Sequence, residues 1–468
     1  MGTLRTSGNE CTYIGGMLMR LDEYLEIVSE QIRYKKIRST VTEELKNHIL
    51  DQAEAFEACG AFPEEAMERA IREMGDPVET GVSLDRIHRP QMHWGIVLSM
   101  AVISLLNIGI FLCADLIAES YPWQRQAGFI IFGFLLMLLV YRLDYSIFEK
   151  VNMKTALLFL AVMLLFIKFG SHPVNGTSRW IKLFGISFSI SELMLLYIPL
   201  FASVLYSLRG EGYGVLIKII PLIFIPTFLL NMMPDLSGSV ILFTCLVFVF
   251  MFTVWKGWFQ IHKNAVIIIS VLSMVSIPFL FIGYLYLFGE EYQIARLQHL
   301  LSPTGTSDYI MQTAKFMREN AAMLGSSQKS LEFLLNGPTT DYLTDLIVAS
   351  MCSIYGVLLT AAMIASLLWI ILKALRISLN QTNQLGMIIG FSCSVVFFIK
   401  TAIGLLVNLQ VIPYVSVSMP FLSYGGSSII ISYILLGLIL SVYRYKNILP
   451  AKKHRPTRKH LKLKITWE

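Results

Sequence analysis

Charged side chains are scarce in this sequence. Of its 468 residues only 15% are Asp, Glu, Lys or Arg, whereas 55% are hydrophobic, and the mean hydropathy is +0.62. A soluble domain usually has nearer ~25% charged residues. Apolar runs of 18 or more residues recur along the chain, and ~20 such residues cross the ~30 Å hydrocarbon core of a bilayer. The composition excludes an ordinary soluble enzyme and predicts a membrane protein with many spans.

Other features are missing as well. The six cysteines show no CxxC or metal-ligand spacing and several lie inside apolar runs, so we expect small buried side chains and no disulfides. The chain does not begin with the basic segment, apolar core and cleavage site that make up a secretory signal, so no such signal is evident. The net charge of +6 is uneven, and the strongly basic tail indicates a cytoplasmic end near anionic lipid rather than a nucleic-acid partner.

The apolar runs predict ten membrane helices, near residues 94–117, 126–143, 153–170, 187–207, 214–232, 237–255, 264–288, 343–373, 384–411 and 419–443. With a cytoplasmic N-terminus, the short inner connections carry most of the Lys and Arg, as the positive-inside rule requires. Two outer connections, 171–186 and 289–342, also carry charged residues, and the topology alone does not explain why those charges are there. We therefore expect an all-α, multi-pass protein of the cell membrane with both termini in the cytoplasm.

Three regions follow from this division: a polar prefix at 1–90, a ten-helix membrane domain at 91–445 with a large extracytoplasmic loop, and a basic tail at 446–468. In the prefix, "VTEELKNHILDQAEAFEACG" and "FPEEAMERAIREMGDP" have helical spacing and end at glycines. His48 is expected to be an ordinary helix residue. The prefix resembles the helical permease-prefix domain found ahead of several Firmicute-type permeases and sensor proteins, which implies a regulatory or docking role.

A single carboxylate, Asp235, stands between two long apolar runs in "NMMPDLSGS". The predicted topology places it at the outer end of the sixth membrane helix. Pro234 suits a helix start, and an aspartate there faces the positive end of the helix dipole. Two interpretations stay open at this point, a helix cap or a functional carboxylate, since ionisable residues inside membranes are commonly functional.

Near the C-terminus stands "MPFLSYGGSSIIISYILLGLILSVYR". It combines a helix breaker, two positions without side chains and three hydroxyls that can satisfy freed backbone groups: Pro420, Gly425, Gly426, Ser423, Ser427 and Ser428. The whole string resembles the signature of the SEDS family (shape, elongation, division and sporulation proteins, including FtsW, RodA and SpoVE). That resemblance implies a ten-helix polymerase that joins lipid II disaccharides into glycan strands.

Four further segments resemble family motifs in the family's order, and together they cover about residues 95 to 445. "VNGTSRWIKLFGISFSISE" resembles the NGxxRWI…PSE region, "MMPDLSGS" the QPDLGT motif, "YQIARLQHLLSP" the start of the large outer loop, and "DYLTDLIVASMCSIYG" the segment that follows it. The positions that match are Asn175, Gly176, Arg179, Trp180, Glu192, Asp235, Arg296, Pro303, Asp345 and Gly356. Asp235 thereby falls on the family's essential aspartate.

Several family residues are replaced. The glutamate usual before Gly356 is Ser353, the lysine that follows the PSE motif is Leu195, and the asparagine usual in the ninth helix corresponds to Gly404. The PSE proline and the QPDLGT glutamine and glycine are Ile190, Met233 and Ser237. The chain is thus a divergent member, for which altered substrate or lost activity is an open alternative.

The resemblance implies a division of roles at the outer face. Asp235 would act as the general base for a sugar hydroxyl, and Arg179 and Arg296 would hold a pyrophosphate. Trp180 would stack on a sugar or anchor the interface, while Glu192 and Asp345 would line the polar cavity or pair with those arginines. Carboxylates beside a pyrophosphate could hold Mg²⁺ or Mn²⁺, although no dedicated cage is evident.

The partners implied are lipid II, a class B penicillin-binding transpeptidase and membrane lipids. Two other functions stay open, a non-catalytic scaffold or regulator of cell-wall synthesis and a transporter or flippase of lipid-linked substrate. A transporter of this size often has inverted repeats, and we find none in the sequence. Elongation, division and sporulation are not distinguished by these residues.

Overall fold

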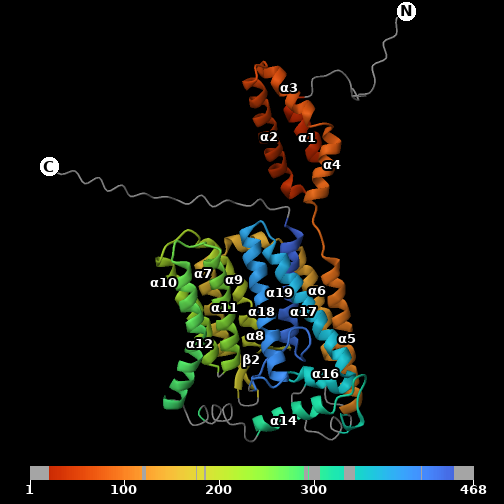
Figure 1. Ribbon diagram of the computed structural model, residues 1–468, viewed down its shortest axis with the longest axis vertical. Coiled ribbons are helices and arrows are strands. Elements are labelled where there is room, and N and C mark those ends of the chain that lie inside the picture. Colours follow the sequence, from red (N-terminus) through yellow and green to blue (C-terminus); the bar gives the residue numbers. More distant parts are fainter. Residues whose placement is uncertain are drawn as a thin grey trace, which may run out of the picture. The chain divides into compact units, whose positions relative to one another are not determined.

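The computed structural model describes residues 20–118, 123–174, 177–183, 186–233, 235–288, 294, 306–330, 332, 343–412 and 414–446. The chain divides into two compact units, with the boundary between Gln91 and Met92. Figure 1 shows a small helical unit and a larger bundle of long helices.

The first unit consists of four α-helices around one small core. They are α1 (Leu21–Gln31), α2 (Arg38–Ala58), α3 (Pro63–Glu73) and α4 (Pro77–His88), with a 3₁₀ turn, η1 (Lys35–Ile37), before α2. Tyr24, Val28 and Ile49 form the centre of the core. Proline begins both α3 and α4, where its missing N–H is not needed. The two helices expected from the sequence are α2 and α3, and His48 is exposed on α2.

The second unit carries the membrane helices. Within the described residues eight helical segments are long and apolar enough to cross a bilayer. They are α5 (Trp94–Ala118), α6 (Trp123–Arg142), the consecutive pair α8 (Ile190–Met194) and α9 (Tyr197–Ser207), α10 (Gly214–Asn231), α11 (Leu236–Trp255), α17 (Val357–Leu379), α18 (Gln384–Asn408) and α19 (Gly426–Arg444). The predicted multi-pass helical fold is confirmed.

Two other predicted spans are also helical. Helix α12 (Lys263–Phe288) has 26 residues. Helix α7 (Met153–Leu165) has only 13 residues, about 20 Å, and continues into a π-helical turn, η3 (Phe166–Gly170). Two shorter elements are η2 (Tyr145–Lys150) and α14 (Thr306–Glu319). All ten predicted spans therefore contain a helix.

Helices α6 and α19 pack very closely. A Cβ at Gly437 would lie 2.8 Å from the carbonyl oxygen of Met137, and one at Gly133 would lie 2.5 Å from the ring of Tyr433. Small residues of this kind let helix backbones approach inside a membrane, where apolar surface alone does not drive association. The close contact sets α19, which carries the signature motif at its start, against α6.

The connection predicted at 171–186 is not a simple loop. It forms a three-stranded antiparallel sheet, β1 (Ser171–Val174), β2 (Thr177–Leu183) and β3 (Ile186–Ser189), in the order β1-β2-β3. Strand β3 leads directly into α8, so the fourth span begins at Ile190 and not at 187. The sequence shows no period-2 signal here, because β1 and β3 have only four residues each and "TSRWIKL" of β2 does not alternate between apolar and polar residues.

Two predicted spans were also too long. The span at 343–373 is broken at Gly356 into α16 (Ile347–Tyr355) and α17. Gly356 has φ +86°, and a Cβ there would lie 2.8 Å from the backbone of Met323 and Leu324. The last span begins at Gly426, since Pro420 lies in a turn before it and Gly425 has φ +142°. Both breaks are at glycines that the backbone conformation requires.

Candidate active site

Asp235 is the N-cap residue of α11. Its Oδ1 accepts a hydrogen bond of 3.0 Å from the backbone N–H of Gly238 and one of 3.2 Å from the hydroxyl of Ser237. The side chain is 5% exposed. The helix cap expected as one interpretation is therefore present. A cap does not remove a carboxylate from chemistry, because each carboxylate oxygen has further lone pairs.

Helix α8 lies directly against this cap. A Cβ at Gly238 would lie 2.7 Å from Oδ2 of Asp235 and 3.0 Å from the Cβ of Ser191, so only a glycine fits between them. Ser191 shares a 2.8 Å hydrogen bond with Ser189 at the end of β3. In the sheet, Ser189 pairs with Trp180 of β2. The structure thus links Trp180 to the surroundings of Asp235 through β3 and α8.

The next residue of α8, Glu192, forms a buried ion pair with a lysine of α18. Lys400 Nζ lies 2.6 Å from Oε1 and 2.9 Å from Oε2 of Glu192. The lysine side chain is 4% exposed and the glutamate 16%. Lys400 also donates to Ser418 at 3.0 Å, and Ser418 donates to Oε1 of Glu192 at 2.8 Å. Ser428 of α19 completes the cluster through a 2.9 Å hydrogen bond with Ser418.

The signature turn, residues 419–425, is held by buried side-chain hydrogen bonds. The Ser423 hydroxyl accepts from the Met419 N–H at 2.8 Å and donates to the Thr344 carbonyl at 2.6 Å. Asn107 of α5 donates to the carbonyls of Phe421 and Leu422. Phe421 has φ +64°, an unusual conformation for a large residue. Gly426 lies against the ring of Phe129, and Ser427 is buried beside it.

Asp345 lies where α16 begins and is half-buried. Its Oδ2 accepts a 2.7 Å hydrogen bond from the Tyr414 hydroxyl, and its carbonyl accepts from Asn408 at 2.9 Å. Asn408 also accepts from the Ala349 N–H. Together with the bond from Ser423 to Thr344, these contacts fasten residues 343–349 to α18 and to the signature turn.

Several predicted residues cannot be placed in full. Asn175, Gly176, Pro234, Arg296 and Pro303 lie outside the described residues. Arg179 lies on β2, but its side chain is not described. Trp180, its neighbour, is half-buried. In Figure 1, β2, α8 and α16 lie towards the same end of the membrane unit as α14.

Lys400 was missed in the sequence analysis. Its signal is visible in "SVVFFIKTAIG", where one cation stands in an apolar helix, and an ionisable residue inside a membrane is a functional candidate by default. The sequence analysis also missed Asn107 and Gln126, two polar residues in apolar helices, and both are fully buried. Gln126 donates to Asn107 and to the carbonyl of Ser423 and accepts from Gly425, so both residues support the signature turn.

The described residues do not fit a metal site made by the protein alone. No group of three His, Cys, Asp or Glu side chains gathers among them. The carboxylate of Glu192 is already paired with Lys400, and that of Asp235 accepts from its own helix. The arrangement places one buried carboxylate, Asp235, at the start of α11 and one buried ion pair, Glu192–Lys400, between the neighbouring α8 and α18.

Comparison with known proteins agrees with this arrangement of motifs. The model of the family described as "Cell cycle protein", FtsW/RodA/SpoVE, matches residues 90–448. The chain belongs to the FtsW/RodA/SpoVE family. The matched region contains the sheet, the Asp235 cap, the Glu192–Lys400 pair and the signature turn.

Two relatives of this chain have moderately similar sequences. One is the "Probable peptidoglycan glycosyltransferase FtsW" of Idiomarina loihiensis, 28% identical over 342 residues, which are 70% of this chain and 79% of that protein. Another is the "Peptidoglycan glycosyltransferase MrdB" of Escherichia coli, 23% identical over 380 residues, 78% of this chain and 96% of that protein.

Solved structures share the fold of this FtsW/RodA/SpoVE protein. A chain of the structure titled "Structural coordination of polymerization and crosslinking by a peptidoglycan synthase complex" matches with a TM-score of 0.60 and 20% identity, covering 75% of this chain and 98% of that one. A mutant form of the rod shape determining protein RodA of Thermus thermophilus matches with a TM-score of 0.50 and 18% identity, covering 76% and 98%.

Proposed function

We propose that this protein is a peptidoglycan glycosyltransferase that polymerises lipid II at the outer face of the cytoplasmic membrane. The observation that carries the proposal is the buried carboxylate of Asp235, in a family whose named relatives are peptidoglycan glycosyltransferases. A nearly enclosed carboxylate at the start of a membrane helix can meet a lipid-linked sugar at the level of the lipid headgroups.

In the proposed reaction, the C4 hydroxyl of one lipid-linked disaccharide attacks the anomeric carbon of another. Asp235 accepts the hydroxyl proton, the new C1–O4 bond forms, and the C1–O bond to undecaprenyl pyrophosphate breaks on the opposite face, so the anomeric configuration inverts. A sugar hydroxyl needs such a base at neutral pH, and general base catalysis typically contributes ~10²–10⁴-fold. The N–H of Gly238 and the hydroxyl of Ser237 fix the Oδ1 atom of Asp235 and so orient the carboxylate.

The leaving pyrophosphate needs cations. Arg179 and Arg296 are proposed for this role, because a guanidinium binds phosphate oxygens bidentately. Trp180 is proposed to stack on a sugar. Asp345, which binds Tyr414 through its carboxylate and Asn408 of α18 through its carbonyl, is proposed to shape the substrate cavity.

The Glu192–Lys400 pair is proposed to position the site without touching substrate. Lys400 is nearly enclosed and engages Glu192, Ser418 and Ser428, so it ties α8, α18 and α19 together. Ser191, beside Glu192, packs on the Asp235 cap. The family lysine at the position of Leu195 is replaced, and in this chain Lys400 of α18 is the cation that pairs with Glu192.

The orientation is part of the proposal. Arg142, Lys150, Arg209, Lys256 and Arg376 lie at or beyond the helix ends opposite to the Asp235 end of α11. By the positive-inside rule that end is cytoplasmic, and Asp235 is then extracytoplasmic. The polar prefix and the basic tail would both lie in the cytoplasm.

A transpeptidase partner follows by analogy. The structure titled as a peptidoglycan synthase complex, whose chain shares this fold, couples polymerization with crosslinking. We propose that the present protein likewise assembles with a class B penicillin-binding transpeptidase, in cell elongation, division or sporulation.

The test is glycan-chain formation from labelled lipid II by the purified full-length protein, with and without a candidate transpeptidase. Polymer is the expected product, with release of undecaprenyl pyrophosphate. Lipid II movement across liposomes without polymer would instead make the protein a transporter. If a well-folded protein shows neither activity, a non-catalytic scaffold is the remaining function, and the proposal is wrong.

A further inference from the structure

The first unit has an uneven distribution of charge. Between residues 20 and 91 there are sixteen Asp and Glu but only ten Lys and Arg. Six of the ten cations nevertheless fall in two short segments, 33–38 and 86–89, as Arg33, Lys35, Lys36, Arg38, Arg86 and Arg89. We call these two segments the basic end. An acidic unit that collects its cations in one place has a surface suited to an anion.

The two segments are brought together by the packing of α1 against α4. A Cβ at Gly81 of α4 would lie 2.7 Å from the Cβ of Gln31 in α1, so the helices touch closely at this point. Just beyond, the backbone N–H of Arg33 donates to Asp85 at 2.9 Å, and the Arg33 guanidinium lies 3.7 Å from the same carboxylate. Asp85 thus aligns the loop after α1 with the end of α4.

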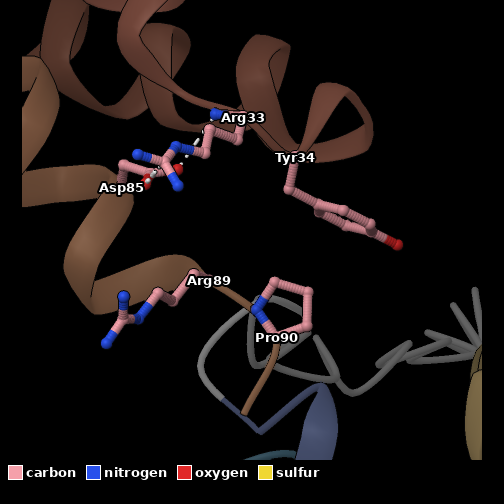
Figure 2. A pocket seen from close by; sticks show the side chains of 5 residues that line it. All are labelled: Arg33, Tyr34, Asp85, Arg89 and Pro90. Carbon is pink, nitrogen blue, oxygen red and sulfur yellow. Dashed lines mark hydrogen bonds and ion pairs between the residues drawn. The ribbon is translucent and has the colours of Figure 1, made fainter.

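A pocket of about 210 Å³ lies between the segments, lined by Arg33, Tyr34, Asp85, Arg89 and Pro90. Figure 2 shows the Arg33–Asp85 pair on one wall, the Tyr34 ring on another, and Arg89 with Pro90 across from them. The Arg33 side chain is 90% exposed, and Arg89 is also exposed. Within the described residues no carboxylate pairs with Arg89, so the pocket has a guanidinium available for an anion.

The chain itself limits where this pocket can lie. Arg89 precedes Trp94, the first residue of the membrane helix α5, by five residues. Five residues reach at most ~18 Å when fully extended. Arg89 therefore stays close to the start of the membrane helix α5 and so within reach of lipid headgroups. Basic clusters beside a membrane helix are attracted to anionic lipid.

We propose that the basic end is a docking site for anionic phospholipid headgroups, with the phosphate held by Arg33 and Arg89 in the Tyr34 pocket. The acidic remainder of the unit would be repelled by the same lipid surface. Attraction at one end and repulsion elsewhere would hold the first unit in one orientation on the membrane. This inference does not depend on the proposed glycosyltransferase activity.

The test uses the full-length protein in nanodiscs of phosphatidylcholine alone or with about 30% phosphatidylglycerol, an anionic lipid. Hydrogen–deuterium exchange of residues 32–38 and 85–91 is measured in each. Anionic lipid is expected to slow exchange several-fold there, and about 1 M NaCl, which shortens the screening length to ~3 Å, to abolish the effect.

Matched variants make the result specific. Arg33→Gln with Arg89→Gln is expected to remove the protection, whereas Arg69→Gln with Arg72→Gln, which removes the same charge from α3, is expected to keep it. Equal loss in both pairs would mean a general charge effect and would overturn the proposal. Equal protection by inorganic phosphate in neutral nanodiscs would make the pocket a site for a soluble anion and would also overturn it, as would absence of protection by anionic lipid.

Discussion

Lys400 of α18 and Glu192 of α8 are separated by 208 positions in the sequence and by 2.6 Å in the structure. Both charges are largely removed from solvent. The pair joins α8, which touches the Asp235 cap, to α18, and the hydrogen bond from Lys400 to Ser428 extends the connection to α19. It gives the candidate site a rigid electrostatic support that the order of motifs along the chain does not reveal.

Removing one partner of this pair should be severe. Lys400→Met leaves the Glu192 charge buried, and losing one partner of a buried pair typically costs about 3–5 kcal/mol. Thermal unfolding in detergent should show the loss, and Glu192→Gln with Lys400→Met should recover much of it. Lys218→Met breaks a half-exposed pair with Glu211, and such pairs are worth about 0–1 kcal/mol. Equal losses of stability in Lys400→Met and Lys218→Met would contradict the conclusion that the Glu192–Lys400 pair is buried.

A kinetic readout distinguishes positioning from mere stability. At a temperature where Lys400→Met is still folded, we expect a lower kcat with little change in KM, because substrate does not touch the lysine. Lys400→Arg, which keeps the charge, should restore part of kcat. A rise in KM alone would indicate that Lys400 binds substrate directly.

Gly356 should tolerate no side chain. Gly356→Ala places a Cβ 2.8 Å from backbone atoms of the 323–324 segment, and the backbone at φ +86°, ψ 166° is in a region almost confined to glycine, which costs another residue about 1–3 kcal/mol. Gly128→Ala is the matched control, since that glycine lies in α6 with open space around it. Alanine in a helix is favoured over glycine by roughly 0.5–1 kcal/mol. The unfolding temperature should fall for the first variant and hold or rise for the second.

Ser353 occupies the position of a family glutamate, yet it has a structural contact. Its hydroxyl is fully buried and donates to the Met317 carbonyl of α14 at 3.2 Å. Ser353→Ala should therefore cost about 1 kcal/mol of stability and leave polymerisation of lipid II close to wild type. A large loss of activity at unchanged stability would show that the hydroxyl replaces a catalytic function of the glutamate.

The sequence predicted the membrane helices well because long apolar runs are an unambiguous signal. It failed at the ends of α16 and α19, where Gly356 and Gly425 break helices inside apolar segments. It also failed at the sheet, because β1 and β3 have only four residues each and β2 does not alternate between apolar and polar residues. Asp235 could be found from its motif and its isolation. The pairing of Glu192 with Lys400 could not, because a contact across 208 residues depends on packing between helices that no local pattern specifies.

The most direct test of the catalytic role is the rate of glycan synthesis by Asp235→Asn beside wild type and Asp144→Asn. Asparagine also caps helices well, so the fold should persist in both variants, and Asp144 is likewise an N-cap, at the start of η2. We predict a fall of about 100-fold or more for Asp235→Asn, since the base is lost, and a near wild-type rate for Asp144→Asn. Undiminished synthesis by folded Asp235→Asn would show that the carboxylate is only a helix cap.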